Sequence, residues 1–326
     1  MQIGTIVSLA GGLPADERAA SRISSVFPRN LRSVTDILGQ SLLERMKAKA
    51  RKTTGGPIYV VPESPSAFSV LPSRSANASS FVAAWEGAVA NLLRQGAQQL
   101  LLMRVGVYTE LDFSELLTFH LARHSRLTQS FGPAGALDVA VVSASALRNG
   151  DGAYGRVLAS LIPRLERFPY QGYINTLKTP NELRQLVEDA LNGRCNLRPV
   201  GAEIETGMWV AEGAQISESV TIMGPAFIGA GARIAEYCTI AGNSTIERGC
   251  KIDFGTNVIK SCVLEYSYVG VGLDLNGVIV NHDRLYHVER NIHLQINDRR
   301  LISPMRVRFP IRLRPQPYYG IQYQRM

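Results

Sequence analysis

The fold is decided by residues 204–263, which read in blocks of six IETGMW VAEGAQ ISESVT IMGPAF IGAGAR IAEYCT IAGNST IERGCK IDFGTN VIKSCV. Each block begins with an aliphatic residue: Ile204, Val210, Ile216, Ile222, Ile228, Ile234, Ile240, Ile246, Ile252 and Val258. From the second block onward, the fifth residue is small or β-branched: Ala214, Val220, Ala226, Ala232, Cys238, Ser244, Cys250, Thr256 and Cys262. A helix repeats every ~3.6 residues and a strand every ~2, so neither alone selects a period of six. A fixed period of six predicts a parallel β-helix.

In such a fold each hexapeptide forms one flat side, and three of them, about 18 residues, complete one coil of a triangular stack. The aliphatic residue points toward the axis and the small residue fits beside the corner, so that stacked coils bury a continuous core. The register slips by one residue at Val263, continues at Val269 and Leu275 and then fades, which gives about four coils. The pattern resembles the left-handed β-helix of hexapeptide-repeat transferases.

Length and charge divide the rest of the chain. At 326 residues and 45% hydrophobic composition, the chain is long enough for about two domains with ordinary cores. The formal net charge is +8; residues 299–326 hold seven Arg and no acid, so the first 298 residues carry only about +1. We expect an α/β domain over residues 1–198, the β-helix over residues 199–285 and a basic extension over residues 286–326.

Cysteine and histidine usage predicts no metal site. Cys238, Cys250 and Cys262 fall at the small inward position of the repeat, where a free thiol behaves as a small hydrophobe. Cys195 has no CxxC partner, and His120 and His124 lie four apart on a predicted helix without a third ligand. The amino terminus lacks a basic n-region, and no apolar run reaches about 18 residues. We therefore expect a cytoplasmic protein without a membrane span.

Strand-like and helix-like segments alternate through the first 198 residues. Strands are predicted at residues 3–10, 58–61, 100–108 and 138–143, and helices from residue 41 and at residues 81–95, 113–124 and 154–167. A further helix starts at Thr179, because Thr179, Pro180 and Glu182 form a capping box with proline in the first turn. Trp85 lies on an apolar helix face and is expected in the core. The alternation predicts an α/β domain with a mostly parallel sheet.

The first strand ends in Leu9-Ala10-Gly11-Gly12. Glycines at the end of a strand let backbone N–H groups approach a phosphate, although two glycines alone are a weak signal. With the Thr179-Pro180 helix and the hexapeptide coils that follow, this order resembles the sugar-phosphate nucleotidyltransferase family. The likeness is to its two-domain form, exemplified by mannose-1-phosphate guanylyltransferases, and it extends from Ile3 to Val280. It implies a Rossmann-like domain that binds nucleotide through Leu9, Ala10, Gly11, Gly12, Arg18 and Arg29.

The chain departs from the family pattern where the family holds its ligands. Asp16 and Glu17 follow the paired glycines, where the family has Gly-Thr-Arg for the triphosphate. The family's first metal-binding Gly-Asp falls at Val105-Gly106, and its second metal Asp falls at Thr176. The acids nearest the first position are Glu110 and Asp112. No Lys lies between residues 127 and 138 to hold a sugar phosphate. Each charge-stabilising group contributes about 3 to 4 kcal/mol to such chemistry, so the sequence predicts a degenerate site.

Three functions follow from the resemblance. The first is a non-catalytic scaffold, regulatory subunit or NDP-sugar sensor of nucleotide-sugar or polysaccharide biosynthesis, which binds a nucleotide or NDP-sugar and a partner protein of that pathway. The second is an active NDP-sugar pyrophosphorylase that uses Mg²⁺ and displaced residues to convert an NTP and a sugar 1-phosphate into NDP-sugar and pyrophosphate. The third is a hexapeptide acyltransferase with His282 as base. We also expect a homo-oligomer formed through the β-helix.

Residues 305–314 read MRVRFPIRLR, in which Arg and apolar residues mostly alternate. The alternation predicts a strand with one apolar and one cationic face, and Pro310 suits an edge strand. Arg clusters attract phosphates, which admits a nucleic-acid or anionic-membrane partner. The interpretation we favour is packing of the apolar face on the β-helix or on a neighbouring subunit, with Tyr318, Tyr319 and Tyr323 as anchors. We therefore expect no nucleic-acid partner.

Overall fold

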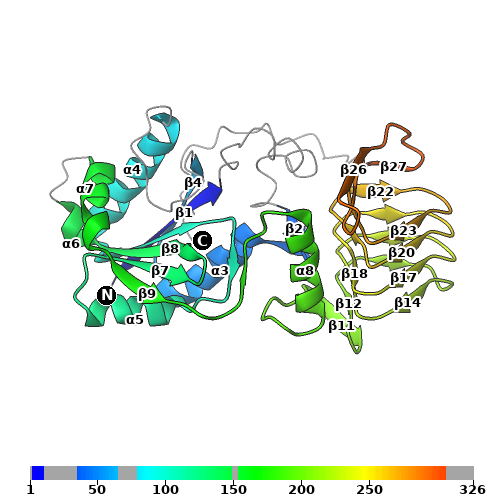
Figure 1. The fold of residues 1–326 in the computed structure, drawn as a ribbon, viewed down its shortest axis with the longest axis horizontal. Coiled ribbons are helices and arrows are strands. Elements are labelled where there is room, and N and C mark those ends of the chain that lie inside the picture. The colour runs from blue at the N-terminus through cyan, green and yellow to red at the C-terminus, as the bar shows by residue number, and fades with distance from the viewer. Residues whose placement is uncertain (1, 11–34, 65–78, 149–152, 306–326) are drawn as a thin grey trace. The chain divides into compact units, whose positions relative to one another are not determined.

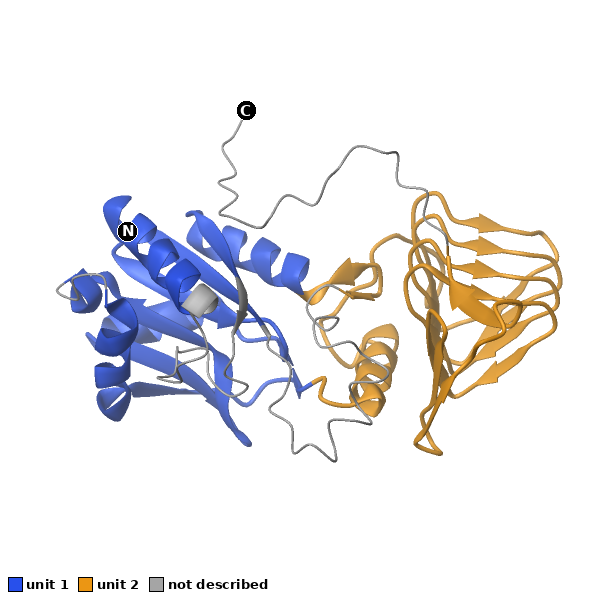
Figure 2. Cartoon of the chain, turned by 90° about the horizontal axis from the view of Figure 1, so that it is seen from above, with its two compact units in different colours: residues 1–14, 43–176, 313–326 blue, residues 15–42, 177–312 orange. Residues whose placement is uncertain are grey.

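The computed structural model of the chain describes residues 2–10, 35–64, 79–148 and 153–305 (Figure 1). These residues form two compact units, coloured separately in Figure 2. Of the described residues, unit 1 contains the first strand and the chain from Leu43 to Thr176, and unit 2 contains residues 35–42 and 177–305. The domain boundaries drawn from the sequence at residues 198 and 285 stay predictions. The two tryptophans, Trp85 and Trp209, lie one in each unit.

Unit 1 is built on a six-stranded sheet with the strand order β4-β1-β5-β8-β7-β9. Its strands are β1 (Ile3–Ala10), β4 (Ile58–Ser64), β5 (Gln99–Arg104), β7 (Leu127–Gly132), β8 (Gly135–Ser143) and β9 (Glu166–Pro169). β1 pairs in parallel with β4 and β5, and β7 pairs in parallel with β9, whereas β8 runs antiparallel to β5 and β7. The predicted α/β domain with a mostly parallel sheet is confirmed.

Helices lie between these strands along the chain, except between β7 and β8. They are α3 (Leu42–Thr54), α4 (Ser79–Arg94), α5 (Phe113–Ala122), α6 (Ala144–Leu147), α7 (Tyr154–Leu161) and the short η2 (Ile162–Arg164). Trp85 of α4 is only 1% exposed and packs in one hydrophobic cluster with Ile6 of β1 and Leu100 of β5. The expectation that Trp85 is a core residue is therefore confirmed.

Two sequence predictions in unit 1 were wrong. The helix predicted over residues 154–167 ends at Leu161, because Pro163 has no N–H to continue it, and residues 166–169 form strand β9 instead. Strand β7 was not predicted, because its central residues Thr128, Gln129 and Ser130 are polar. All three are buried in the sheet, where Ser130 Oγ donates to the Val139 carbonyl at 2.9 Å.

Unit 2 contains three sheets of short strands. The first has β11 (Ala202–Glu205), β12 (Met208–Val210), β15 (Ala226–Ile228), β18 (Ser244–Ile246), β21 (Cys262–Val263), β24 (Val278–Asn281), β25 (Arg284–His287) and β26 (Ile292–Gln295). The second has β13 (Gln215–Ile216), β16 (Arg233–Ile234), β19 (Lys251–Ile252), β22 (Ser267–Val269) and β27 (Ile302–Pro304). The third has β14 (Thr221–Met223), β17 (Thr239–Ala241), β20 (Asn257–Ile259) and β23 (Asp274–Asn276).

The chain visits these sheets in rotation, so each strand pairs in parallel with the strand one coil later. Ile228 pairs with Ile246, Ile234 with Ile252 and Ile240 with Val258, in each case 18 residues on. The region is therefore a stack of short parallel strands that is compatible with a β-helix, as Figure 1 shows. We refer to the residues from Met208 to Asn281 as the coil stack.

The aliphatic residues of the repeat form the core of the coil stack from the second coil onward. Ile228, Ile234 and Ile240 are at most 3% exposed and belong to one hydrophobic cluster. Ile204 was wrongly assigned to this row: it is 56% exposed, because it lies on β11, which runs antiparallel to β12 and forms no side of a coil. Cys238 and Cys250 lie in the cluster as predicted.

The predicted slip of one residue in the register is confirmed. It turns the side chain of Cys262 from the inner to the outer face of the coil. Ile246 pairs with Val263 and Ile252 with Val269, which are 17 residues apart. Val263 belongs to the core cluster, so its neighbour Cys262 points outward from the coil, because successive side chains of a strand face opposite sides. The prediction that Cys262 points inward was wrong. Cys262 is nevertheless buried, in an outward row with Phe227, Thr245 and Ile279.

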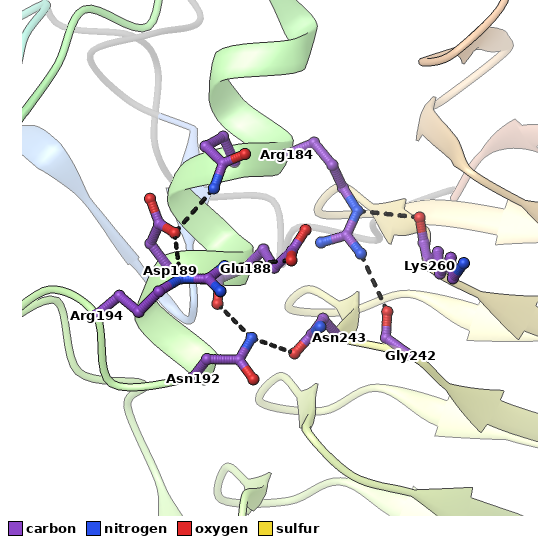
Figure 3. A network of polar contacts seen from close by, with 9 residues as sticks. Arg184, Glu188, Asp189, Asn192, Arg194, Gly242, Asn243 and Lys260 are labelled. Atoms are coloured by element: carbon purple, nitrogen blue, oxygen red, sulfur yellow. Dashed lines mark hydrogen bonds and ion pairs between the residues drawn. The ribbon is translucent and has the colours of Figure 1, made fainter.

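Helix α8 (Pro180–Leu191) is attached to the corners of the coil stack (Figure 3). Its predicted capping box is confirmed: the Glu182 N–H donates to Thr179 Oγ1 at 3.2 Å, and the Thr179 N–H donates to Glu182 Oε2 at 3.1 Å. The Arg184 guanidinium donates to the Lys260 carbonyl and to the Gly242 carbonyl, each at 3.0 Å. The corner carbonyls thus hold the helix through one arginine.

A hairpin far away in the sequence is attached to the coil stack through the buried carboxylate of Glu247. β2 (Asp36–Ile37) and β3 (Gln40–Ser41) are joined by Leu38 and Gly39, whose φ values of 55° and 85° are typical of a two-residue hairpin turn. Their N–H groups donate to the two oxygens of Glu247 at 2.8 and 2.9 Å. Burial raises the pKa of Glu247 to about 8; these two hydrogen bonds oppose the rise, and the nearby Asp36 and Glu265 carboxylates add to it.

The isoleucines of the repeat are less buried in the first coil than in the second. We therefore expect truncation of equivalent isoleucines to lower the stability of unit 2 by different amounts. We expect Ile234→Ala in the second coil to lower the free energy of unfolding of unit 2 by about 2 to 5 kcal/mol, because it leaves a cavity in a packed core. Ile222→Ala, the matched change in the half-buried first coil, should cost clearly less. Denaturant unfolding followed by Trp209 fluorescence in a Trp85→Phe background measures both. Equal losses would contradict the gradient.

The buried Glu247 predicts that unit 2 loses stability as pH rises. Since its pKa is about 8 in the folded chain and near 4.5 when exposed, its contribution is full below pH 4.5 and is lost as pH rises toward 8. Glu247→Gln stays neutral and keeps only one acceptor oxygen. We therefore expect it to be less stable than the parent at pH 5 and to lose less stability between pH 5 and 8.

The exposed Glu236→Gln is the control for Glu247→Gln and should leave the pH profile of unfolding unchanged. The measurement is the free energy of unfolding at intervals from pH 5 to 8, with the same Trp209 signal. If the difference between Glu247→Gln and the parent stays constant over this range, the carboxyl of Glu247 does not titrate there and the prediction is wrong.

Candidate functional site

The carboxyl end of β1 lies at a topological switch point of the unit 1 sheet. β1 is flanked by β4 on one side and β5 on the other, and the chain runs from β1 to β4 and then back across to β5. Connections that leave neighbouring parallel strands in opposite directions open a crevice at their carboxyl ends, where ligands of α/β proteins bind. The last residues of β1 and β5 are therefore the natural place for a ligand.

Two of the predicted nucleotide-binding residues are described at this point. Leu9 is half-buried, and Ala10 is the last residue of β1. Gly11, Gly12, Arg18 and Arg29 lie outside the described residues. The structure thus brings Leu9 and Ala10 to the switch point, and the assignment of the other four stays a prediction from the sequence.

A buried polar row crosses the sheet at the same level and was not predicted. Ser8 of β1 lies opposite Arg104 of β5, and Met103 pairs with Val139, which brings Arg104 opposite Asp138 of β8. Arg104 Nη2 donates to Asp138 Oδ1 at 2.7 Å, and the Arg104 and Asp138 side chains are 9% and 11% exposed. A possible sequence signal was the single charged residue at the end of the apolar strand LLLMR. The row holds a guanidinium in a fixed place at the carboxyl end of β5.

A short ladder brings together the two segments to which the resemblance assigns metal ligands. β6 (Tyr108–Thr109) and β10 (Ile174–Asn175) pair antiparallel, with Asn175 opposite Tyr108. Gly106 precedes β6 and Thr176 follows β10, so both positions lie at the same end of this ladder. Neither position carries a carboxylate.

Glu110 and Asp112, the acids that follow Gly106 in the sequence, have other roles in the described structure. Asp112 is the N-cap of α5, where its carboxylate accepts the Ser114 N–H at 2.8 Å, and hydrogen bonds from Ser114 lower its pKa. The Glu110 carboxylate accepts a 3.4 Å hydrogen bond from the Tyr108 hydroxyl. In the part of the chain that the structure describes, no group of three His, Cys, Asp or Glu side chains could hold a metal ion. The donor set present here therefore does not fit Mg²⁺.

Of the histidines considered from the sequence, His120 has hydrogen-bond partners at both ring nitrogens. His120 Nδ1 lies 2.8 Å from Thr128 Oγ1, and its Nε2 lies 2.9 Å from Ser143 Oγ, while burial lowers its pKa to about 4. His124 lies beyond the end of α5, with φ 48°. His282 follows β24, its N–H donates to Ser267 Oγ at 2.9 Å, and burial lowers the pKa of its ring. His120 is thus a neutral structural residue of unit 1.

The buried Arg104–Asp138 pair predicts that the stability of unit 1 depends strongly on both charges. Arg104→Met leaves Asp138 buried without its guanidinium, so we expect a loss of about 3 to 5 kcal/mol in the free energy of unfolding. The double variant Arg104→Met/Asp138→Leu removes both charges and should be more stable than Arg104→Met. Arg126→Met, at an exposed arginine of the same unit, is the control.

These variants are compared by denaturant unfolding followed by Trp85 fluorescence in a Trp209→Phe background. The single variant Asp138→Leu completes the comparison. If the losses in unfolding free energy of the two single variants add in the double variant, the two side chains are not coupled, and the polar row has no role in fixing the guanidinium.

Comparison with known proteins assigns no relative to this geometry. No protein-family model matches the sequence. No curated protein matches it. Among the helices of the described residues, none has both the length and the apolar character needed to cross a bilayer. The function proposed below is therefore argued from the residues and geometry of the chain itself.

Proposed function

We propose that this chain is a sugar-nucleotidyltransferase-like protein that binds an NDP-sugar without turning it over. In this proposal it acts as a sensor, scaffold or regulatory subunit of nucleotide-sugar or polysaccharide biosynthesis. The observation that carries the proposal is the switch point at the carboxyl ends of β1 and β5. β1 delivers Leu9 and Ala10 to this point, and the sequence continues with Gly11 and Gly12, whose residue type allows a phosphate to approach the backbone.

The proposal includes a finer description of both units. We assign unit 1 to the Rossmann-like nucleotidyltransferase type and the coil stack to the left-handed parallel β-helix of hexapeptide-repeat proteins. Support for the first is the switch point together with the ladder between β6 and β10. Support for the second is the rotation of the chain through three sheets with partners 18 residues apart.

Loss of catalysis is supported by the side chains at the β6–β10 ladder. Transfer of a nucleotidyl group depends on positioning and on neutralising phosphate charge with metal ions and cations. The segments are arranged for this, but Gly106 and Thr176 offer no carboxylate, and Asp112 is engaged in capping α5. We infer that the polar groups that remain stabilise the unit, while binding of the nucleotide at the switch point persists.

We further propose that the protein is cytoplasmic and self-associates through the coil stack, beside a partner protein of the same pathway. All four cysteines are free and buried, which agrees with a reducing compartment.

An apolar contact for self-association is offered by three side chains that follow one another along a corner of the stack. Tyr237, Phe254 and Val271 are 66%, 48% and 60% exposed. Sedimentation velocity of the variant Tyr237→Ser/Phe254→Ser tests this. If the variant has the same oligomeric mass as the parent, these apolar side chains are not the interface.

Ligand binding at the switch point predicts a stabilisation specific to unit 1. NDP-sugars are added to the Trp209→Phe chain, and unfolding is followed by Trp85 fluorescence. A bound NDP-sugar should raise the free energy of unfolding by about 2.7 kcal/mol at a concentration of 100 Kd. Ala10→Asp places a negative charge beside the proposed phosphate site and should abolish the shift. Ala136→Asp, at an exposed alanine of the same unit, should keep it.

A parallel assay of pyrophosphate release decides between the functions. With Mg²⁺, an NTP and a panel of sugar 1-phosphates, we expect no release above background. Release at an enzymatic rate would instead identify an active pyrophosphorylase. The absence of any shift across the NDP-sugar panel would contradict the ligand, and acetyl transfer that is lost in His282→Ala would replace the proposal with an acyltransferase.

A further inference from the structure

The eight-stranded sheet of unit 2 ends in an open edge at β26 (Figure 1). β26 pairs with β25, and no other described strand pairs with its far side. At the opposite edge of the same sheet, β11 carries Glu203 and Glu205, whereas β26 reads Ile-His-Leu-Gln and has neither a charged residue nor a proline. Charges and prolines on an edge strand hinder its pairing with other chains. β26 lacks this protection.

The backbone groups of β26 alternate between β25 and the open edge. The Ile296 N–H, just after β26, donates to the Asp283 carbonyl at 2.8 Å, and the same register continues along both strands. Because these directions alternate along an antiparallel strand, His293 and Gln295 direct their N–H and C=O groups away from β25. These two residues therefore offer two donors and two acceptors to an added strand.

One face of β26 is apolar and only partly covered. Ile292 and Leu294 are 43% and 46% exposed. Ile296 lies on the same face, two residues further on, and packs against the core cluster of the coil stack, as does Leu285, which lies opposite Leu294. The exposed face of β26 thus continues the inner side of the coil stack. An added strand with aliphatic side chains on this face would extend the core.

The sequence around β26 is complementary to itself when two copies run antiparallel. Residues 289–299 read ERNIHLQINDR, with Leu294 at the centre. The residues at equal distances from this centre match as apolar with apolar, amide with amide and acid with base: Ile292–Ile296, Asn291–Asn297, Arg290–Asp298 and Glu289–Arg299. Glu289, Arg290 and Arg299 are exposed. A second copy of this chain therefore has the chemistry that the open edge requires.

The match is specific to one register. With the centre one residue earlier, at His293, Arg290 would lie opposite Ile296. With the centre at Leu294, His293 of one copy lies opposite Gln295 of the other. These are the residues whose backbone groups face the open edge, so each pair can exchange two hydrogen bonds.

We propose that β26 pairs with β26 of a second copy, antiparallel and about a twofold axis at Leu294. The two eight-stranded sheets then form one continuous sheet, and Ile292, Leu294 and Ile296 of both copies form one apolar row. This contact is separate from the corner of the coil stack that carries Tyr237 and Phe254, and it does not depend on the proposed function. The strand predicted at residues 306–314 lies outside the described residues and has no part in it.

Removal of one edge N–H tests the pairing. Gln295→Pro deletes an N–H that faces the open edge, where an edge strand tolerates proline, so pairing with β25 should persist. In sedimentation velocity of the full-length chain, we expect this variant at half the mass of the parent. Gln295→Ser keeps the N–H, is the matched control and should keep the mass of the parent. Circular dichroism of both variants shows whether they are folded.

An oxidative cross-link tests the register. Leu294 of each copy lies opposite itself in a pair without mutual hydrogen bonds, where Cα atoms are about 4.5 Å apart, a separation that a disulfide can span. We expect Leu294→Cys to form a disulfide-linked dimer on oxidation. Ile204→Cys, at a 56% exposed site on β11, is the control and should stay monomeric on a non-reducing gel. The four native cysteines are buried and give little background.

Charge reversal tests the two ends of the contact. In Glu289→Arg/Arg290→Asp, each reversed residue meets a like charge on the second copy, and we expect the Kd of the dimer to rise about tenfold. Adding Asp298→Arg/Arg299→Glu restores opposite charges and should restore the Kd. Asp298 also pairs with the exposed Arg300 of its own chain, so both pairs are reversed together.

Four results would overturn the proposal. One is a parent chain that is monomeric at every concentration. Another is a folded Gln295→Pro variant with the mass of the parent; if Tyr237→Ser/Phe254→Ser then dissociates, association belongs to the corner of the coil stack. The third is equal cross-linking of Leu294→Cys and Ile204→Cys. The fourth is a Kd that the second pair of charge reversals does not restore.

Discussion

Parallel pairing of each short strand with the strand one coil later is the constraint on which unit 2 depends. Strands of two or three residues have too few hydrogen bonds to persist alone, so each is held by its neighbours in the stack. The side chain that faces the axis must then recur at the same place in every coil, as in the pairs Ile228–Ile246 and Ile240–Val258. A shift of one residue, as at Cys262, exchanges the inner and outer faces.

The outer face created by this constraint is used to attach distant parts of the chain. Polar groups at the corners make the attachments: the carbonyls of Gly242 and Lys260 accept from Arg184, and the Glu247 carboxylate accepts from the turn between β2 and β3. A buried acid is costly, and here each of its two oxygens accepts a hydrogen bond from a backbone N–H group of the turn. The coil stack thus serves as the support for the hairpin and for α8.

Local signals in the sequence predicted most of the elements but missed β7 and β9, and the contacts that they missed are long-range ones. The six-residue period predicted the core positions and the slip, and Thr179 with Glu182 predicted the start of α8. Ile204 continues the period but was misassigned, because it lies on β11, which pairs antiparallel with β12 and forms no side of a coil. The Arg104–Asp138 row depends on which strands become neighbours, and the contact of Glu247 with Leu38 joins residues 209 positions apart. Periodicity within one segment contains neither piece of information.

The same distinction separates the backbone arrangement of the candidate site from its side chains. The switch point is fixed by strand order, and the β6–β10 ladder is fixed by backbone pairing; neither depends on a carboxylate at position 106 or 176. Asp112 caps α5, and Asp138 holds Arg104, so both acids contribute to stability where they stand. Under the proposed function, a phosphate held by backbone N–H groups would need only the strand order at the switch point, and no carboxylate at position 106 or 176.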